Sequence, residues 1–372
     1  MNAGNLYVGL ISGTSADGID AALVTFQDNS PKLIAHHLHP IPVTTRQQLI
    51  SLFTPDQHQI DLMGELDIEI GSLFAAATRT LLEKAGAKPA QVRAIGSHGQ
   101  TIRHRPDNKR PFTLQIGDPN TISHLTGLPV VADFRRRDMA CGGQGAPLAP
   151  IFHQECLGDA GECRVILNLG GIANVTLLPG TASGKQSVAM DTGPASGLMD
   201  AWCLAHLNTP YDQDGAWAQQ GNVIEPLLTN WLKDPYFAQP APKSTGKEYF
   251  HLNWAGDLAS APLKDFQAMD VQATLLALTV TSVMDAIKRL PMPPDRILAC
   301  GGGVHNKALM TQLQTASPCP LETTIGAGID PDWVEAMCFA WLAKCHIEGK
   351  KLETRPFTGA REPVLMGGFY PA

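Results

Sequence analysis

The chain has 372 residues, of which 44% are hydrophobic and 17% are charged, and its formal net charge is −7 at pH 7. This length and composition predict a globular protein of two domains with a large core. The negative charge, with one basic run at Arg135–Arg137 flanked by Asp133 and Asp138, argues against nucleic-acid binding. No apolar run approaches the roughly 18 residues needed to span a bilayer, so we expect no membrane insertion.

Two short apolar stretches near the N-terminus, Tyr7–Ile11 and Ile19–Phe26, predict strands that are joined by a polar turn. Asp17-Gly18 within this turn is a strong hairpin signal, because both residues tolerate the left-handed region. Ser12-Gly13-Thr14-Ser15 adds three hydroxyls, a bare backbone and extra N–H groups, and such a turn can bind an anion. A plain hairpin and an anion-binding turn both remain open from these residues alone.

The rest of the chain alternates helical and strand patterns, which is typical of an α/β architecture. Helices are predicted over Ile60–Ala85, Gly197–Leu207, Val271–Leu290 and Trp333–Ile347. Strands are predicted over Val92–Ser97, Val130–Ala132, Val165–Leu169 and Ile297–Cys300. The Pro-rich stretch Asp234–Lys243 predicts a surface excursion between elements.

Glycine-rich turns recur along the chain. Residues 165–178, VILNLGGIANVTLL, again surround a glycine-containing turn with two apolar strands, and residues 301–306, GGGVHN, follow a predicted strand and precede a helix. Such turns supply N–H donors to phosphate or pack closely on a flat base. Three of them predict a nucleotide held between two related domains.

Other nucleotide and metal motifs fail on spacing. Residues 180–186, GTASGKQ, are one residue short of a Walker A loop and lack its final Ser or Thr. No GxGxxG follows a strand, so a dinucleotide-binding fold has little support. His36-His37-Leu38-His39 has no nearby Cys or carboxylate at ligand spacing, which favours surface histidines over a metal site.

Cysteine usage and the N-terminus predict a cytoplasmic protein. The eight cysteines form no CxxC pair, and most lie in apolar runs such as Ile297–Cys300, as expected for buried thiols in a reducing compartment. The chain starts Met-Asn-Ala-Gly-Asn directly before a predicted strand, without the basic start and apolar core of a secretory signal.

Nine segments, in order and in register, resemble one known family. They are GLISGTSADGID (9–20), SHGQTIRH (97–104), QIGDPNTIS (115–123), VVADFRRRDMACGGQGAPLAP (130–150), NLGGIANVT (168–176), MDTGPASGLMDAW (190–202), KSTGKEYF (243–250), GGGVHNKALM (301–310) and EAMCFAWLA (335–343). The chain thereby resembles the anhydro-N-acetylmuramic acid kinases, members of the actin, hexokinase and Hsp70-like ATPase superfamily, over nearly its whole length.

The resemblance implies an α/β fold of two related actin/hexokinase-like (ribonuclease H-like) domains around an interdomain nucleotide cleft. We expect domain I at residues 1–132 with the first phosphate hairpin, and the C-terminal segment 355–372 returning to it. Domain II at residues 133–354 would carry the second hairpin, the catalytic Asp and the adenosine-side turn.

The resemblance also implies ATP and Mg²⁺. The expected nucleotide-binding residues are Gly13, Thr14, Ser15, Ala16, Asp17, Gly18, Ile19 and Asp20 in the first phosphate loop, Asn168, Leu169, Gly170 and Gly171 in the second, and Gly301, Gly302, Gly303 and Asn306 on the nucleoside side. Asp17 or Asp20 would hold Mg²⁺, which keeps several waters and binds one or two carboxylates. The choice between them stays open, and Asp20 equally fits a solvent-facing strand position.

The family's reaction opens the 1,6-anhydro ring of anhydro-N-acetylmuramic acid and phosphorylates O6, in peptidoglycan recycling. Asp191 is the expected base. It follows an apolar-leaning run and precedes Thr192-Gly193-Pro194, so its side chain should project from the end of a strand into the cleft. The alternative from sequence is that Asp191 caps the following helix.

The expected small-molecule partner is this amino sugar. Arg135 would bind its lactyl carboxylate, with an interdomain salt bridge as the rival interpretation. His98, Gln100 and Thr101 would offer further hydrogen bonds to the sugar. Glu335 would either touch the sugar or stabilise the N-terminus of its own helix. We also expect a homodimer.

Four positions depart from the family pattern: Ala16, where Leu is common, Cys141, where a small or aliphatic residue is common, and Ala195-Ser196, where Gly-Asn is common. Two other classes of function stay open. A non-metabolic actin-like or Hsp70-like ATPase module would need a polymer-binding or peptide-binding surface. A sugar-binding regulator with a decayed site would have lost phosphate-loop glycines or Asp191, which this chain retains.

Overall fold

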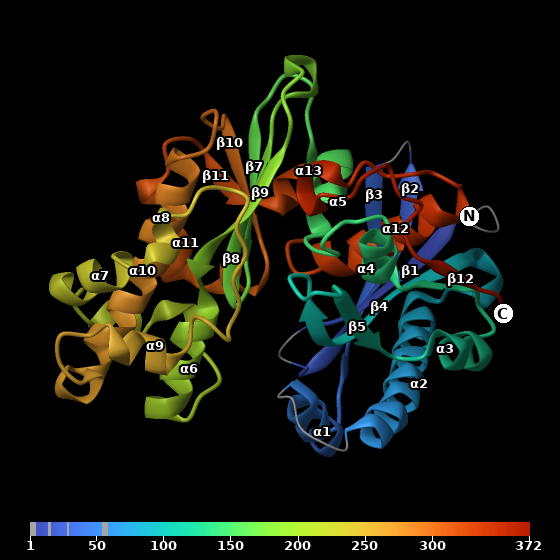
Figure 1. Ribbon diagram of the computed structural model, residues 1–372, viewed down its shortest axis with the longest axis horizontal. Helices are drawn as coiled ribbons and strands as arrows, with labels where there is room; N and C mark the ends of the chain where they lie inside the picture. Colours follow the sequence, from blue (N-terminus) through green and yellow to red (C-terminus); the bar gives the residue numbers. More distant parts are fainter. Residues whose placement is uncertain (1–4, 14–15, 28–29, 54–58) are drawn as a thin grey trace. The chain divides into compact units, whose positions relative to one another are not determined.

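The computed structural model describes residues 5–13, 16–27, 30–53 and 59–372. The contacts divide the chain into two compact units, each with its own sheet (Figure 1). Unit 1 comprises Met1–Cys156 and Trp333–Ala372, and unit 2 comprises Leu157–Asp332.

Unit 1 is built on a sheet with the strand order β12-β6-β4-β1-β2-β3, and β5 also pairs with β4. The strands are β1 (Leu6–Ser12), β2 (Gly18–Gln27), β3 (Ser30–Pro40), β4 (Val92–Arg105), β5 (Phe112–Ile116), β6 (Val130–Ala132) and β12 (Gly368–Tyr370). Strands β1, β2 and β3 form an antiparallel meander, whereas β4 runs parallel to both β1 and β6.

The helices of unit 1 are α1 (Val43–Phe53), α2 (Ile60–Ala85), α3 (Pro119–Thr126), α4 (Phe134–Ala140), α5 (Ala149–Leu157), whose last residue falls in unit 2, α12 (Val334–Ile347) and α13 (Arg355–Thr358). Helix α12 packs directly on β1 and β4. Gly9 and Gly96, which pair across these strands, allow the close approach, since a Cβ on either would overlap the α12 backbone. Glu335 at the start of α12 is thereby held beside the sheet.

Unit 2 contains a five-stranded sheet in the order β11-β10-β7-β8-β9. Its strands are β7 (Arg164–Leu169), β8 (Ile172–Leu178), β9 (Val188–Pro194), β10 (Arg296–Cys300) and β11 (Leu321–Thr323). Here too an antiparallel meander is followed by two strands parallel to its first member. The order repeats that of β3-β2-β1-β4-β6, so the two units share one topology, as the predicted fold class requires.

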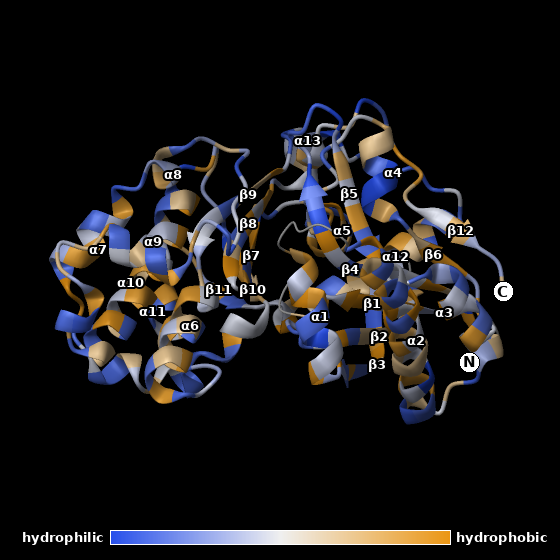
Figure 2. Ribbon diagram, turned by 60° about the horizontal axis from the view of Figure 1, so that its bottom comes forward, coloured by the Kyte–Doolittle hydropathy of each residue, from blue (hydrophilic) through white to orange (hydrophobic). Residues whose placement is uncertain are grey.

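The helices of unit 2 are α6 (Ser196–Leu207), α7 (Glu225–Leu232), α8 (Pro235–Ala238), α9 (Leu252–Asp257), α10 (Ala268–Lys288) and α11 (Lys307–Ala316). Hydrophobic and hydrophilic residues alternate along these helices (Figure 2). Helix α10 lies at the centre of the group, where it packs against α6, α7 and α11. Among the described residues, α10 is the one helix long and apolar enough to cross a membrane, and 78% of that stretch is buried inside the protein. The expectation that no run reaches this length is therefore wrong, and α10 is a core helix.

Short 3₁₀ helices connect the larger elements, at Pro89–Gln91, Thr181–Ser183, Gln213–Gly215, Ala218–Gln220, Leu263–Asp265, Gly302–His305 and Thr324–Ala327. The predicted helix over Ile60–Ala85 and strand over Val130–Ala132 match α2 and β6 at both ends. The stretch Asp234–Lys243 is not only a surface excursion, because Tyr236 and Phe237 in α8 are buried. The predicted burial of cysteines holds for five of the eight, and none of the eight, all of which lie within the described residues, forms a disulfide.

The division between the units falls after residue 156, not after residue 132 as expected from the sequence. The buried carboxylate of Asp138 explains the difference. It accepts hydrogen bonds from the hydroxyls of Thr354 (2.9 Å) and Thr358 (2.8 Å) and from the N–H of Gly145 (2.8 Å). These bonds fasten residues 138–145 to the C-terminal part of unit 1, whose last strand, β12, pairs with β6.

Candidate active site

The second and third glycine-rich turns lie side by side in unit 2, because β7 and β10 are parallel neighbours and Cys300 pairs with Asn168. Gly301 has φ +81°, and a Cβ there would overlap the Asn168 side chain. A Cβ on Gly303 would lie 2.7 Å from that of Leu169. The two turns therefore pack so closely that only glycine fits where they meet.

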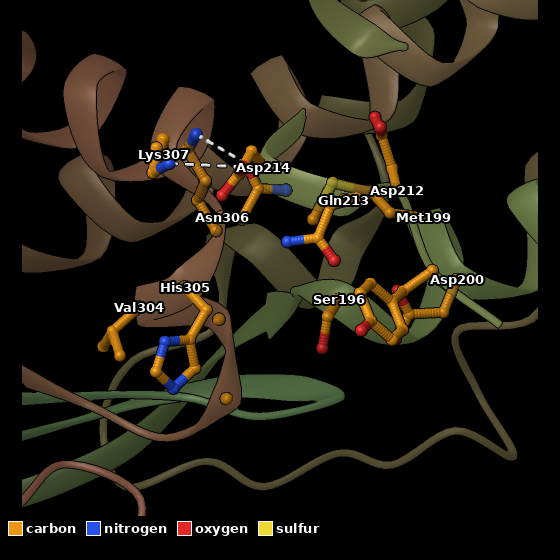
Figure 3. A pocket seen from close by; sticks show the side chains of 14 residues that line it. Ser196, Met199, Asp200, Asp212, Gln213, Asp214, Val304, His305, Asn306 and Lys307 are labelled. Atoms are coloured by element: carbon orange, nitrogen blue, oxygen red, sulfur yellow. Dashed lines mark hydrogen bonds and ion pairs between the residues drawn. The ribbon is translucent and has the colours of Figure 1, made fainter. Parts of the chain in front are cut away.

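Beside these turns lies a cavity of about 650 Å³ (Figure 3). Ser196 and Asp200 lie on one side of it, and Val304 to Lys307 lie on the other. Of the predicted nucleoside-side residues, Gly302, Gly303 and Asn306 line the cavity. Gly302 faces open space, and the Asn306 amide oxygen caps α11 by accepting from Leu309 N–H at 3.0 Å. The size suits a drug-sized ligand.

Asp191 lies on β9, beside Asn174 of β8. Its Oδ2 accepts a hydrogen bond from Thr245 N–H at 2.9 Å, and its own N–H donates to the Lys243 carbonyl at 2.9 Å. Burial raises the pKa of its carboxyl to about 6, although the Thr245 N–H and the Lys243 charge oppose the rise. A carboxyl with this pKa is ionised at neutral pH and basic enough to accept a proton. The helix-cap alternative is wrong, because α6 begins at Ser196 and its cap position is Ala195.

Ala195-Ser196, which departs from the family pattern, holds the second glycine-rich turn. The Ala195 N–H donates to the Gly171 carbonyl at 3.1 Å. The Ser196 N–H and hydroxyl both donate to the Gly170 carbonyl, at 3.1 and 2.7 Å. The carbonyls of this turn are thus tied to the start of α6.

The first turn belongs to unit 1, and it is described at Gly13 and from Ala16 onward, while Thr14 and Ser15 lie outside the described residues. The Gln100 amide is fully buried and braces it, since its Nε2 donates to the Gly13 carbonyl at 3.1 Å and its Oε1 accepts from the Ser12 hydroxyl at 2.6 Å. Ala16 is buried with φ +50°, where a small side chain fits a left-handed turn. Gly18 and Ile19 form the start of β2. Gln100, expected to touch sugar, has its amide engaged with the protein.

The metal candidates are both near this turn. Asp17 is exposed, and Asp20 is half-buried on β2 between Ile11 and Leu38. Within the described ranges, no group of three or more His, Cys, Asp or Glu side chains could hold a metal ion.

Arg135, His98 and Glu335, three of the predicted sugar-binding residues, lie close together in unit 1. Arg135 Nε donates to His98 Nε2 at 2.8 Å, and Arg135 Nη1 donates to the Gly145 carbonyl at 2.9 Å. Burial and the Arg135 charge lower the pKa of His98 well below its usual value, so the ring is neutral. Burial lowers the pKa of Arg135, and the charge of Glu335 opposes this. Thr101 lies on β4, where its hydroxyl accepts from Gln115 Nε2 at 3.1 Å.

Sequence reasoning missed four residues around Asp191 and the second turn: Lys243, Thr245, Lys247 and Asp200. The first three belong to KSTGKEYF, a segment recognised as a family motif without a role. Asp200 lines the cavity, and burial raises the pKa of its carboxyl to about 6 while Lys247 lowers it. Asp200 lies in MDTGPASGLMDAW, another segment that resembles the family, and it too had no predicted role.

Two units of one topology, each with a glycine-rich turn between its first antiparallel strands, define the two-domain actin/hexokinase-like fold class. Residues 5–372 match the family model for anhydro-N-acetylmuramic acid kinase. The anhydro-N-acetylmuramic acid kinase of Coxiella burnetii is 50% identical over 365 residues, covering 98% of this chain and 97% of the relative. That of Xanthomonas axonopodis pv. citri is 49% identical over 372 residues, covering 99% and 98%. The chain belongs to the anhydro-N-acetylmuramic acid kinase family, which confirms the predicted resemblance.

Solved structures with similar folds are more distant. The activator of the 2-hydroxyisocaproyl-CoA dehydratase from Clostridium difficile, with bound ADPNP, has a TM-score of 0.46 at 10% identity, covering 92% of this chain and 96% of its own. A ROK family glucokinase from Streptomyces griseus, in complex with glucose and AMPPNP, has a TM-score of 0.40 at 13% identity, covering 91% and 99%.

Proposed function

We propose that the chain transfers the γ-phosphoryl group of ATP to O6 of 1,6-anhydro-N-acetylmuramic acid while water opens the anhydro ring. The products are N-acetylmuramic acid 6-phosphate and ADP, and the reaction serves peptidoglycan recycling in the cytoplasm. The observation that carries the proposal is the Asp191 carboxyl, whose pKa is raised to about 6 by burial in the unit that also holds the second and third turns.

Asp191 acts as the base in the proposed reaction. It takes a proton from water as the water oxygen bonds to C1 and the C1–O6 bond breaks. In the same event O6 bonds to the γ-phosphorus, and the bond from that phosphorus to ADP breaks. A glycosidase would need a second carboxyl to protonate the leaving oxygen. Here the phosphoryl group takes up that oxygen, so one carboxylate suffices.

The glycine-rich turns bind ATP. The second turn, Asn168–Gly171, and the first turn, Gly13–Asp20, offer backbone N–H groups to phosphate oxygens, where developing charge is stabilised by fixed donors. Gly302, Gly303 and Asn306 bind the adenosine, because they line the cavity of unit 2.

Asp17 or Asp20 would hold Mg²⁺. Their carboxylates fit this ion, which keeps several of its waters and needs only one or two protein carboxylates. No cage of three ligands is required, in agreement with the side chains of the described residues. When bound, the ion neutralises charge on the phosphates.

Arg135 binds the lactyl carboxylate of the sugar. Two of its N–H groups bond to His98 and Gly145, and the others remain for a bidentate pair with a carboxylate. Thr101 and Glu335, also in unit 1, contact the sugar hydroxyls. His98 orients Arg135, because its Nε2 accepts from Arg135 and its Nδ1 lies 2.9 Å from the Gly99 carbonyl oxygen. Gln100 acts indirectly, by bracing the first turn.

The test is incubation with ATP, Mg²⁺ and 1,6-anhydro-N-acetylmuramic acid, followed by mass spectrometry of the sugar. We expect a product heavier by one phosphoryl group and one water, formed in equal amount with ADP. ADP formation that ignores the sugar would instead favour an ATPase module, and sugar binding without turnover would favour a regulator. Sedimentation of the pure protein tests the expected homodimer.

A further inference from the structure

The segment Lys243–Phe250 links the candidate base to the second glycine-rich turn within unit 2. The Lys243 carbonyl accepts from Asp191 N–H, and Thr245 N–H donates to Asp191 Oδ2, each at 2.9 Å. Phe250 anchors the other end of the segment, since its side chain is buried in the unit 2 core. The residues between these anchors are therefore held at a defined place.

Lys247, in the middle of this segment, extends over Gly171. A Cβ built on Gly171 would lie 2.5 Å from Lys247 Cε and 3.3 Å from its Nζ. The bare Cα of Gly171 thus makes room for the lysine, and the ammonium lies against the turn that is expected to receive phosphate. Gly170 beside it is more open, with the nearest atom to its Cβ position 3.3 Å away.

The Lys247 ammonium is also uncommitted. In the part of the chain that the structure describes, it makes no hydrogen bond and no ion pair within 4.0 Å, and its side chain is exposed. Lys243 differs, because its ammonium donates to the Tyr236 carbonyl at 2.9 Å and lies 4.3 Å from that ring's centre. Lys247 lowers the pKa of the Asp200 carboxyl, which lies on the wall of the cavity.

We propose that Lys247 binds the terminal phosphates of the nucleotide at the Gly170-Gly171 turn. An ammonium on a flexible stem is a compact charge suited to phosphate oxygens, and it stabilises the negative charge that moves during phosphoryl transfer. Because Thr245 holds Asp191, the same segment orients the base and binds the group being transferred. The inference rests on the proposed function only in that the cavity of unit 2 takes a nucleotide.

The test is calorimetric titration of the full chain with AMP-PNP and, separately, with AMP, in the presence of Mg²⁺. Lys247→Met should weaken AMP-PNP binding by about ten- to a hundredfold, the usual effect of losing a hydrogen bond to a charged group. AMP binding should stay within about twofold, because AMP lacks the terminal phosphates. Lys247→Arg should restore part of the loss. Lys264→Met, which removes an exposed lysine outside the cavity lining, is the matched control and should change neither affinity.

Equal losses for AMP-PNP and AMP would overturn the proposal, since they would indicate general damage to the cavity. Unchanged AMP-PNP binding in Lys247→Met would overturn it as well. The titration measures binding without turnover, so it tests the role of Lys247 separately from the proposed function. A wild-type chain that binds AMP-PNP through Lys247 but leaves the anhydro sugar intact would contradict the proposed function alone. A wild-type chain that binds no AMP-PNP would contradict both.

Discussion

The backbone N–H of Thr245 donates a hydrogen bond to Oδ2 of Asp191 at 2.9 Å, although the two residues are 54 positions apart in the chain. This bond orients the carboxylate and favours its charged form, while burial favours the neutral form and prevails, so the pKa rises to about 6. Asp191 is therefore a carboxylate held at a cost in stability, a pattern common at catalytic positions.

The rate should follow the ionisation of Asp191. A base must be deprotonated to accept a proton, so kcat/KM for the anhydro sugar should rise with pH to a plateau, with a midpoint near pH 6. Asp200 also has a pKa of about 6, so Asp200→Asn is the control and should keep the rise. A profile that is flat between about pH 5 and 7, or a rise that disappears in Asp200→Asn, would argue against Asp191 as the base.

Asp191→Asn should make the folded protein more stable at neutral pH. A carboxyl whose folded pKa is raised loses stability as pH rises from the unfolded pKa, about 4, through 6. The neutral amide can still accept the Thr245 bond and avoids this loss. Because the side chain is half-buried, we expect a gain on the order of 1–2 kcal/mol at pH 7.5 and little change at pH 4, by urea unfolding.

Asp138→Asn is the comparison for that measurement. The Asp138 carboxylate accepts three hydrogen bonds from neighbours in unit 1. The amide of the variant would point its own N–H groups at one or more of these donors. It should lower the free energy of unfolding by about 2–4 kcal/mol at pH 7.5. Equal changes of the same sign in the two variants would show that the Asp191 carboxyl carries no special cost.

Gln100→Met should act on ATP and spare the sugar. It removes the bonds to Gly13 and Ser12 that brace the first turn, while keeping a side chain of similar length. We expect the KM for ATP to rise about five- to fiftyfold, with the KM for the sugar within about twofold. Steady-state kinetics in both substrates would decide. A selective rise in the sugar KM would restore the interpretation of Gln100 as a substrate contact.

Arg135→Met should reveal what Arg135 binds. If its free N–H groups pair with the lactyl carboxylate, the variant should raise the KM for 1,6-anhydro-N-acetylmuramic acid by about ten- to a hundredfold. The matched substrate is 1,6-anhydro-N-acetylglucosamine, which lacks the lactyl group and should lose far less. Equal losses on both sugars would indicate that Arg135 only supports His98.

The fold was predictable where local patterns agree with burial. Helix α2 has a strong apolar face and glycine at its C-terminus, so both ends could be read from the sequence. The unit boundary could not, because it depends on hydrogen bonds between Asp138 and residues more than 200 positions later. Glycine-rich turns can be recognised in the sequence by their glycines. Lys247 and Asp200 are ordinary residue types, and only the tertiary fold brings Lys247 near Gly171 and Asp200 to the cavity. The role of Gln100 likewise depends on which neighbour its amide meets.

The central claim is that ring opening and phosphorylation are one event that depends on Asp191. The most direct measurement is the reaction of wild-type and Asp191→Asn chains with ATP and the anhydro sugar in ¹⁸O-labelled water, followed by mass spectrometry of the products. In the wild type, the label should appear at C1 of the sugar and none in the phosphate. In the variant, sugar cleavage and sugar-dependent ADP release should fall together by about 10²–10⁴-fold. Label in the phosphoryl group, or phosphorylation of O6 at near wild-type rate in the variant, would contradict this account.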